Sequence, residues 1–172
     1  MKLYFIRHAI AMERAEWSDD DLLRPLTDKG RKRARQAFEG LSRIADEPDI
    51  IFTSRATRAL QTAEILNKAF PGARLEQTEL LNPGAGLEDL RLLLHQNDME
   101  SRIAALVGHE PDFSEMISGL LQGRSETNGN DFRDLHLAVK KASFIEIELF
   151  GSALAGELSQ FISPSVLRKL AE

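Results

Sequence analysis

Leu3-Tyr4-Phe5-Ile6-Arg7-His8 is the stretch that decides the fold of this chain. Four consecutive apolar residues are typical of a strand buried on both faces, and this run stops abruptly at a guanidinium and an imidazole. Ligands of open α/β sheets bind just beyond the carboxyl ends of the strands. The stretch therefore predicts a first strand that delivers Arg7 and His8 to a ligand site.

A second apolar run, 103–108, ends in the same way at His109. A single histidine after a strand is most often a capping or partly exposed residue, and an arginine before it is most often a solvated charge. The repetition favours a functional role. Two buried strands that each end in a histidine, with arginines nearby, suggest chemistry on an anion.

Strand-like runs alternate with segments of helical periodicity along the whole chain. Strands are predicted at 3–6, 49–53, 74–77, 103–108 and 144–150, with a weaker candidate at 135–139. Helices are predicted to begin after the N-caps Thr27 and Ser54, near Leu87, at Pro111 and at Pro164. This order predicts one α/β domain over residues 1–172, with a mainly parallel central sheet and helices on both faces.

Composition limits the partners and the compartment. The chain has 172 residues, 42% hydrophobic and 28% charged, which is ordinary for a globular protein. A net charge of −5 without a basic, aromatic-rich stripe argues against nucleic acid, and no apolar segment reaches transmembrane length. The absence of cysteine excludes disulfides and thiolate chemistry. We therefore expect a cytoplasmic protein that is monomeric by default.

Three predicted strand-to-helix junctions carry polar or basic groups: Arg7-His8, Ser54-Arg55 and His109-Glu110-Pro111. In a parallel sheet all three lie at the same edge. Arginines, imidazoles and the backbone N–H groups of helix N-termini together suit a phosphate, with a carboxylate as the alternative ligand. Arg58, one turn further along its helix, is expected on the surface.

A metal site is the alternative explanation for the two histidines. Zinc requires three or four protein ligands, and carboxylates could complete such a set. However, the sequence has no His-x-x-x-His or comparable spacing, and arginines beside the histidines would repel a cation. We therefore expect neither a metal nor another cofactor.

At these junctions the sequence resembles the histidine phosphatase superfamily, whose fold is the phosphoglycerate mutase-like fold. The resemblance is carried, in the family's order, by Arg7-His8-Ala9, by 25–30, by 53–63 and by 107–111. Within the family the chain is most similar to the short SixA-type phosphohistidine phosphatases, because it lacks room for the helical insertion of larger relatives. The resemblance thus implies an open site that accepts a phosphorylated side chain of a protein.

The resemblance also implies roles for individual residues. His8 would be the nucleophile that forms a phosphohistidine intermediate, with its other ring nitrogen donating to a backbone carbonyl. Arg7, Arg55 and His109 would hold the phosphoryl oxygens by electrostatic preorganisation. Ser54 would add a hydroxyl or a backbone N–H to the phosphate site.

The proton donor to the leaving group is less defined. Glu79 is the tentative general acid by its position, and Glu110 is a weaker candidate. The segment Met12–Arg24 and the loop Arg124–Asp131 have no assigned role.

The prediction is a metal-independent phosphatase that removes phosphate from phosphohistidine on a protein, such as a signalling phosphotransfer domain. A small-molecule phosphomonoesterase of the same fold is one alternative, and a non-catalytic phosphate-binding module is another. The presence of both histidines argues against the binding module, because a protein that only binds phosphate needs no nucleophile.

Overall fold

A mixed sheet forms the centre of the protein in the computed structural model, which describes residues 1–97, 102–123, 137–150 and 154–172. Its strands lie in the order β3-β2-β4-β1-β5-β6. Their bounds are β1 Lys2–Arg7, β2 Ile50–Ser54, β3 Arg74–Thr78, β4 Ile103–Gly108, β5 Phe144–Leu149 and β6 Gly156–Ile162. The first four strands pair in parallel, whereas β5 is antiparallel to both of its neighbours.

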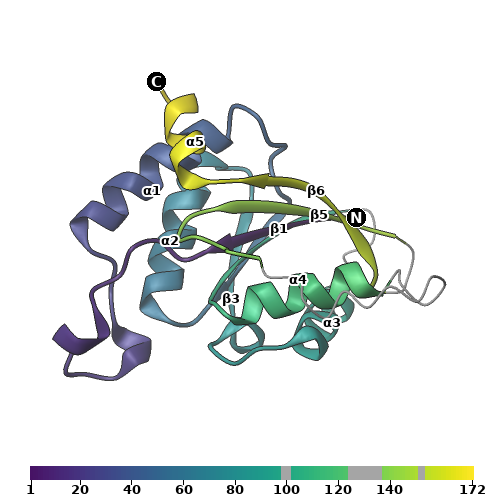
Figure 1. The fold of residues 1–172 in the computed structure, drawn as a ribbon, viewed down its shortest axis with the longest axis horizontal. Coiled ribbons are helices and arrows are strands. Elements are labelled where there is room, and N and C mark those ends of the chain that lie inside the picture. Colours follow the sequence, from purple (N-terminus) through teal and green to yellow (C-terminus); the bar gives the residue numbers. More distant parts are fainter. Residues whose placement is uncertain (98–101, 124–136, 151–153) are drawn as a thin grey trace.

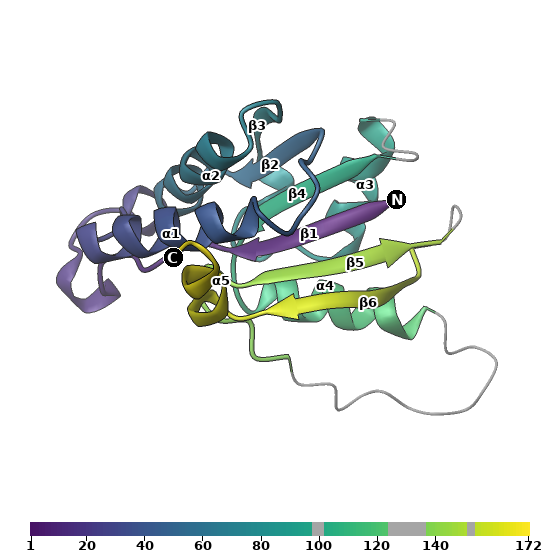
Figure 2. The same cartoon turned by 90° about the horizontal axis from the view of Figure 1, so that it is seen from above.

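Helices cover both faces of this sheet (Figures 1 and 2). One face carries α1 (Asp28–Leu41), α2 (Thr57–Ala69) and α5 (Pro164–Leu170), and the other carries α3 (Leu87–Gln96) and α4 (Asp112–Gln122). Short 3-10 turns are η1 (Arg14–Glu16), η2 (Asp21–Leu23) and η3 (Glu79–Leu81). Among the described residues, no helix is both long and apolar enough to cross a membrane.

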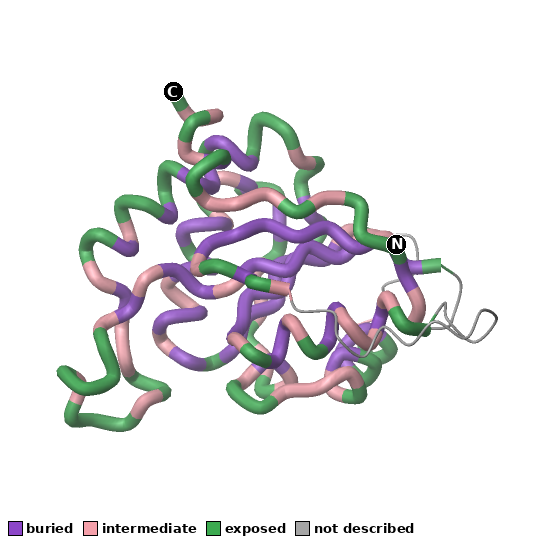
Figure 3. The backbone as a smooth tube through the Cα atoms, in the orientation of Figure 1, coloured by how far each residue is buried: buried purple, intermediate pink, exposed green. Residues whose placement is uncertain are grey.

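The core consists of two apolar clusters, one on each face of the sheet. Tyr4 and Ile6 of β1 point into the cluster under α1, α2 and α5, whereas Leu3 and Phe5 point into the cluster under α3 and α4. The sheet is accordingly the most deeply buried part of the chain in Figure 3. Burial on both faces explains why β1 has no polar alternation.

The predicted fold class is confirmed, with differences in detail. Strand β6 was not predicted, and residues 137–139 form no strand; the rest of the weak candidate 135–139 lies outside the described residues. The N-cap of α2 is Ala56, so the prediction for Ser54 was wrong. Ser54 lies three residues before α2 begins, and its oxygen accepts a hydrogen bond from the Ala56 N–H at 3.1 Å.

The sheet register sets the two histidines on neighbouring strand ends. Arg7 of β1 pairs with Gly108 of β4, and the His8 N–H donates to the Gly108 carbonyl at 3.0 Å. Thr62 of α2 accepts from the Ala9 N–H at 3.0 Å, which ties the turn after His8 to that helix. The carboxyl edge of the sheet therefore fixes both histidines and brings α2 against them.

Candidate active site

His8 and His109 lie side by side at the carboxyl ends of β1 and β4. Their ring centroids are 5.3 Å apart, and the rings are inclined by 55°. Only 7% of His8 and 3% of His109 is exposed. Because parallel strands end at the same edge of a sheet, the pairing of β1 with β4 produces the predicted juxtaposition.

His8 is held as a neutral imidazole with a defined tautomer. Its Nδ1 lies 2.8 Å from the Ala9 carbonyl oxygen, and a carbonyl can only accept, so Nδ1 carries the proton. Burial, followed by the charges of His109, Arg58 and Arg7, lowers the pKa of His8 to about 3 despite the Ala9 hydrogen bond. The lone pair of neutral His8 is therefore on Nε2, as a nucleophilic role requires.

A chain of three side chains sets the tautomer of His109. The Asn82 Oδ1 accepts from the Arg55 N–H and from the Ser54 hydroxyl, each at 3.0 Å. This uses the only hydroxyl proton of Ser54, so the 2.9 Å contact between Ser54 Oγ and His109 Nε2 requires a proton on Nε2. Burial and Arg58 lower the pKa of His109 to about 3. Neutral His109 thus presents a lone pair on Nδ1.

Ser54 therefore enters the site differently from the prediction. It is fully buried, and its oxygen already contacts His109, Asn82 and the Ala56 N–H. These contacts occupy the hydroxyl, so its role in the structure is to orient His109. Asn82, which was not among the predicted site residues, supports both Ser54 and the turn before α2.

Arg7 reaches the site from the last residue of β1. Its Nη1 donates to the Val139 carbonyl at 2.8 Å, in the irregular segment before β5. Its positive charge lowers the pKa values of both His8 and His109, so the Arg7 guanidinium interacts electrostatically with both rings. The carbonyl of residue 139 therefore helps to aim this guanidinium.

Arg58 is the second arginine of the histidine pair, and the prediction that it lies on the surface was wrong. Only 4% of this residue is exposed, because it lies in the first turn of α2 on the side that packs against the site. Its Nη2 pairs with the Asp21 carboxylate at 3.1 Å, and its Nη1 donates to the Asp21 carbonyl at 2.7 Å. The segment Met12–Arg24 thus holds Arg58 through η2.

Arg24 completes this support. Its Nε pairs with the Asp21 carboxylate at 2.9 Å, and its Nη1 donates to the Met12 carbonyl at 2.6 Å. The Asp21 carboxylate consequently lies between two guanidinium groups, and its pKa is lowered by these arginines against the opposing effect of burial. Arg24 thereby holds Asp21, and Asp21 holds the two Nη atoms of Arg58 in place.

Arg55 and Glu79 lie together on the surface. The Arg55 Nη1 pairs with a Glu79 carboxylate oxygen at 2.5 Å, and the two side chains are 58% and 68% exposed. Arg55 precedes α2 rather than lying within it, so its side chain turns away from the histidines while its backbone N–H contacts Asn82. The structure thus brings Arg58, and not Arg55, to the histidine pair.

Three buried nitrogens of the site have no hydrogen-bond partner among the described residues: Arg7 Nε, Arg58 Nε and His109 Nδ1. The two Nε–H groups can only donate. The His109 Nδ1 accepts when neutral and donates when protonated, and a neighbouring anion favours the protonated form. Buried polar groups are normally hydrogen-bonded, so these three nitrogens suit an oxygen-rich anion that arrives with a proton.

Glu110 lies close enough to Arg7 for the two charges to interact. One of its carboxylate oxygens accepts from the Ser114 hydroxyl at 2.5 Å, and the other is buried without a partner among the described residues. Burial raises the pKa of Glu110, while Ser114 and Arg7 act in the opposite direction. The Arg124–Asp131 loop lies outside the described residues. Within the described ranges, no three His, Asp or Glu side chains come together as a candidate metal site.

Comparison with known proteins identifies the family. The profile of the histidine phosphatase superfamily, branch 1, matches residues 3–83. An uncharacterized protein of a Picosynechococcus strain is 35% identical over 147 residues, which is 84% of this chain and 83% of that protein. The chain belongs to the histidine phosphatase superfamily, as the sequence motifs predicted.

Solved structures confirm the phosphoglycerate mutase-like fold. The protein histidine phosphatase SixA, in complex with tungstate, superposes with a TM-score of 0.77 at 20% identity, over 97% of this chain and 99% of that chain. The phosphoglycerate mutase of Bacillus anthracis superposes with a TM-score of 0.72 at 16% identity, over 99% and 96%. The described part of the chain therefore shares its fold with these two proteins.

Proposed function

We propose that this protein is a phosphohistidine phosphatase that uses His8 as its nucleophile and a protein as its substrate. One observation carries the proposal. Near His8, whose Nε2 carries the lone pair, are three buried nitrogens, from Arg7, Arg58 and His109, that no described residue satisfies. A phosphoryl group supplies the oxygens for these nitrogens and the phosphorus for the lone pair.

In the first step, the His8 Nε2 attacks phosphorus in line with the P–N bond of the substrate phosphohistidine. The P–N bond to His8 forms, the substrate P–N bond breaks, and the substrate imidazole, which enters protonated on its other ring nitrogen, leaves as neutral imidazole. Arg7 and Arg58 donate to the non-bridging oxygens, where negative charge gathers. His109 has the position to take up the phosphoryl proton at Nδ1 and to donate it in the transition state.

In the second step, water attacks the phosphorus of phosphorylated His8. The oxygen–phosphorus bond forms, the bond to Nε2 breaks, and inorganic phosphate leaves with both protons of the water, while His8 keeps its proton on Nδ1. The hydrogen bond from Nδ1 to the Ala9 carbonyl is present in both steps, so the ring keeps one orientation. No cofactor is part of this scheme, because the side-chain cations carry the phosphoryl charge.

The position of the predicted general acid favours phosphohistidine as the substrate. Glu79, the predicted general acid, is exposed and paired with Arg55, whereas Asn82, an amide with no acidic proton, supports Ser54 beside His109. An imidazole leaves with less help from an acid than an alkoxide does. The similarity in fold to SixA, a protein histidine phosphatase, supports the same substrate class.

The proposal is tested by phosphate release in the presence of a chelator. The wild-type protein and His8→Ala are each incubated with a protein phosphorylated on histidine and with para-nitrophenyl phosphate. We expect release from the phosphoprotein by the wild type and none by His8→Ala. A strong preference for the small ester would instead support the phosphomonoesterase, and no release from either substrate would support the phosphate-binding module.

A further inference from the structure

A second cleft adjoins the turn that follows His8. It has a volume of about 480 Å³ and lies between α1, the segment before β5 and the beginning of α5. Ala9 and Ile10, the residues directly after His8, form part of its wall, and Arg7 lines it as well. The cleft therefore borders the site of the histidine pair on the α1 side of the sheet.

Cations from three separate segments line this cleft. They are Arg33 of α1, Lys140 and Lys141 before β5, and Arg168 of α5. No acidic residue is among its lining residues, and none of the four cations makes an ion pair with a described residue. The whole chain carries a net charge of −5, so this gathering of positive charge is a local feature.

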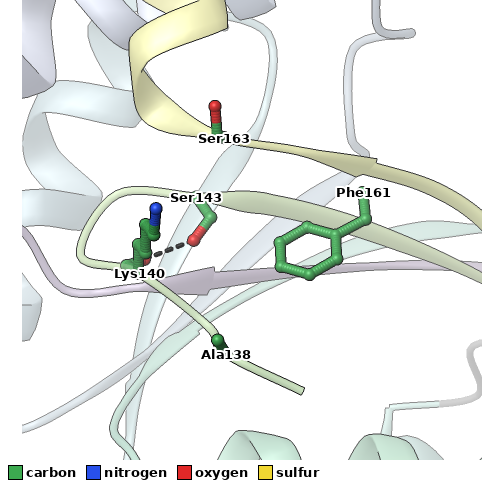
Figure 4. A pocket seen from close by; sticks show the side chains of 5 residues that line it. All are labelled: Ala138, Lys140, Ser143, Phe161 and Ser163. Atoms are coloured by element: carbon green, nitrogen blue, oxygen red, sulfur yellow. Dashed lines mark hydrogen bonds between the residues drawn. The ribbon is translucent and has the colours of Figure 1, made fainter. Parts of the chain in front are cut away.

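A neighbouring hollow of about 290 Å³ adjoins the cleft (Figure 4). Lys140 lines both spaces, and Ser163 of the hollow directly precedes Pro164 of the cleft. The ring of Phe161 extends from β6 toward Ser143 and is 42% exposed as a residue. Phe161 pairs with Ile145, which packs in the cluster under α3 and α4, so its ring lies on the opposite face of the sheet from the cleft and is not part of it.

We propose that this cleft is a docking surface for acidic side chains of the phosphoprotein substrate. The proposal rests on the proposed function, because the phosphohistidine of the docked protein would lie in the pocket of His8. Arg33 and Lys140 are exposed, and the cleft extends from the turn after β1 to α5. Such a wide, solvated set of cations suits several carboxylates on a protein, which it attracts and orients during encounter.

Two peptides and two double variants test the proposal. Each peptide contains a non-hydrolysable phosphohistidine analogue, flanked by four glutamates in one peptide and by four glutamines in the other. Arg33→Glu/Arg168→Glu reverses two charges of the cleft. The matched control is Lys32→Glu/Arg35→Glu. It reverses two exposed charges of α1, the helix of Arg33, at residues that do not line the cleft.

We expect the wild type to bind the glutamate peptide about tenfold more tightly than the glutamine peptide at low salt, from several weak charge pairs together. The preference should disappear in Arg33→Glu/Arg168→Glu, remain in the control, and weaken with added salt. Hydrolysis of para-nitrophenyl phosphate should be unchanged in both variants, which verifies that they are folded.

Equal binding of the two peptides by the wild type would overturn the proposal, as would an equal loss of preference in the control. If pyrophosphate binds the wild type but not Arg33→Glu/Arg168→Glu while the two peptides bind equally, the cleft is a site for small anions and the docking proposal is wrong. A cleft-dependent preference for glutamate without any phosphohistidine hydrolysis would leave the docking surface in place and contradict the proposed function.

Discussion

Arg58 is the residue on which the charge balance of the pocket depends most. Its Nη atoms are held by Asp21, which leaves Nε as the edge directed to a ligand. We expect Arg58→Ala to lower kcat for phosphate release by about 10²–10³-fold, the typical loss for one preorganised donor to a transition state. Steady-state kinetics on a phosphohistidine protein measure this loss.

Arg55→Ala is the matched control for that change. The Arg55 side chain is exposed and pairs with Glu79, so its loss removes a surface ion pair of at most about 1 kcal/mol and leaves the pocket intact. We expect less than a tenfold change in kcat. If Arg55→Ala were the more damaging substitution, the assignment of the second arginine to position 58 would be incorrect.

The sequence predicted the histidines more reliably than the second arginine, for a physical reason. Arg7, His8 and His109 follow directly from buried strands, and a strand has only one carboxyl end. Arg55 and Arg58 differ by three residues near a helix start, where a shift of two residues in the boundary decides which side chain faces inward. The spacing of buried residues in α2 distinguishes the two arginines. Arg58 lies four residues before Thr62 and eight before Leu66, so it shares their buried side of the helix.

Helix α1 packs so closely against the turn after β1 that one position of the helix must be a glycine. A Cβ at position 30 would lie 2.0 Å from the Ile10 carbonyl oxygen, and that same oxygen accepts from the backbone and the hydroxyl of Thr27. Only a glycine permits this approach. The helix is thereby anchored two residues after His8.

We therefore expect Gly30→Ala to destabilise the protein by about 1–3 kcal/mol, the usual cost of forcing a group into a closely packed contact. Urea unfolding followed by circular dichroism measures this loss. Gly84→Ala is a useful comparison, because a Cβ there meets no atom within 4 Å and the cost comes only from the positive φ of 94°. An unchanged midpoint in Gly30→Ala would contradict the close approach.

Most elements were predictable, and the exceptions share a cause. β6 is an edge strand that pairs only with β5, and its central Glu157, Leu158 and Ser159 are exposed, so no clear alternation marks it. Residues 137–139 have the opposite character. Val139 is buried and apolar, yet the segment is irregular, because its carbonyl serves Arg7 rather than a sheet partner. The pattern of apolar residues in a sequence indicates which residues are buried, and a buried residue does not have to lie in a strand.

At the scale of the whole molecule, two buried neutral histidines link stability to pH. The pKa values of His8 and His109 are about 3 in the folded protein, against about 6.5 for an unfolded chain. Between these values the unfolded chain binds more protons. The contribution of the histidines is therefore fully present above about pH 6.5 and decreases as the pH falls below it, by up to about 1.4 kcal/mol per pH unit for each histidine.

Urea unfolding between about pH 7.5 and pH 5 measures this dependence. The double variant His8→Asn/His109→Asn retains polar side chains at both positions but cannot take up protons there, so its free energy of unfolding should change less with pH than that of the wild type. Equal slopes for the two proteins would show that the histidines do not account for the dependence.

The central claim is that His8 Nε2 becomes covalently phosphorylated. The most direct measurement is a rapid-quench experiment with a radiolabelled phosphohistidine protein, followed by digestion and mass spectrometry under alkaline conditions that preserve phosphohistidine. We predict label on the peptide that contains Arg7-His8-Ala9, lost by hydrolysis as inorganic phosphate appears, and no label in His8→Ala. Label on His109 alone, or phosphate release by His8→Ala at the wild-type rate, would contradict the account.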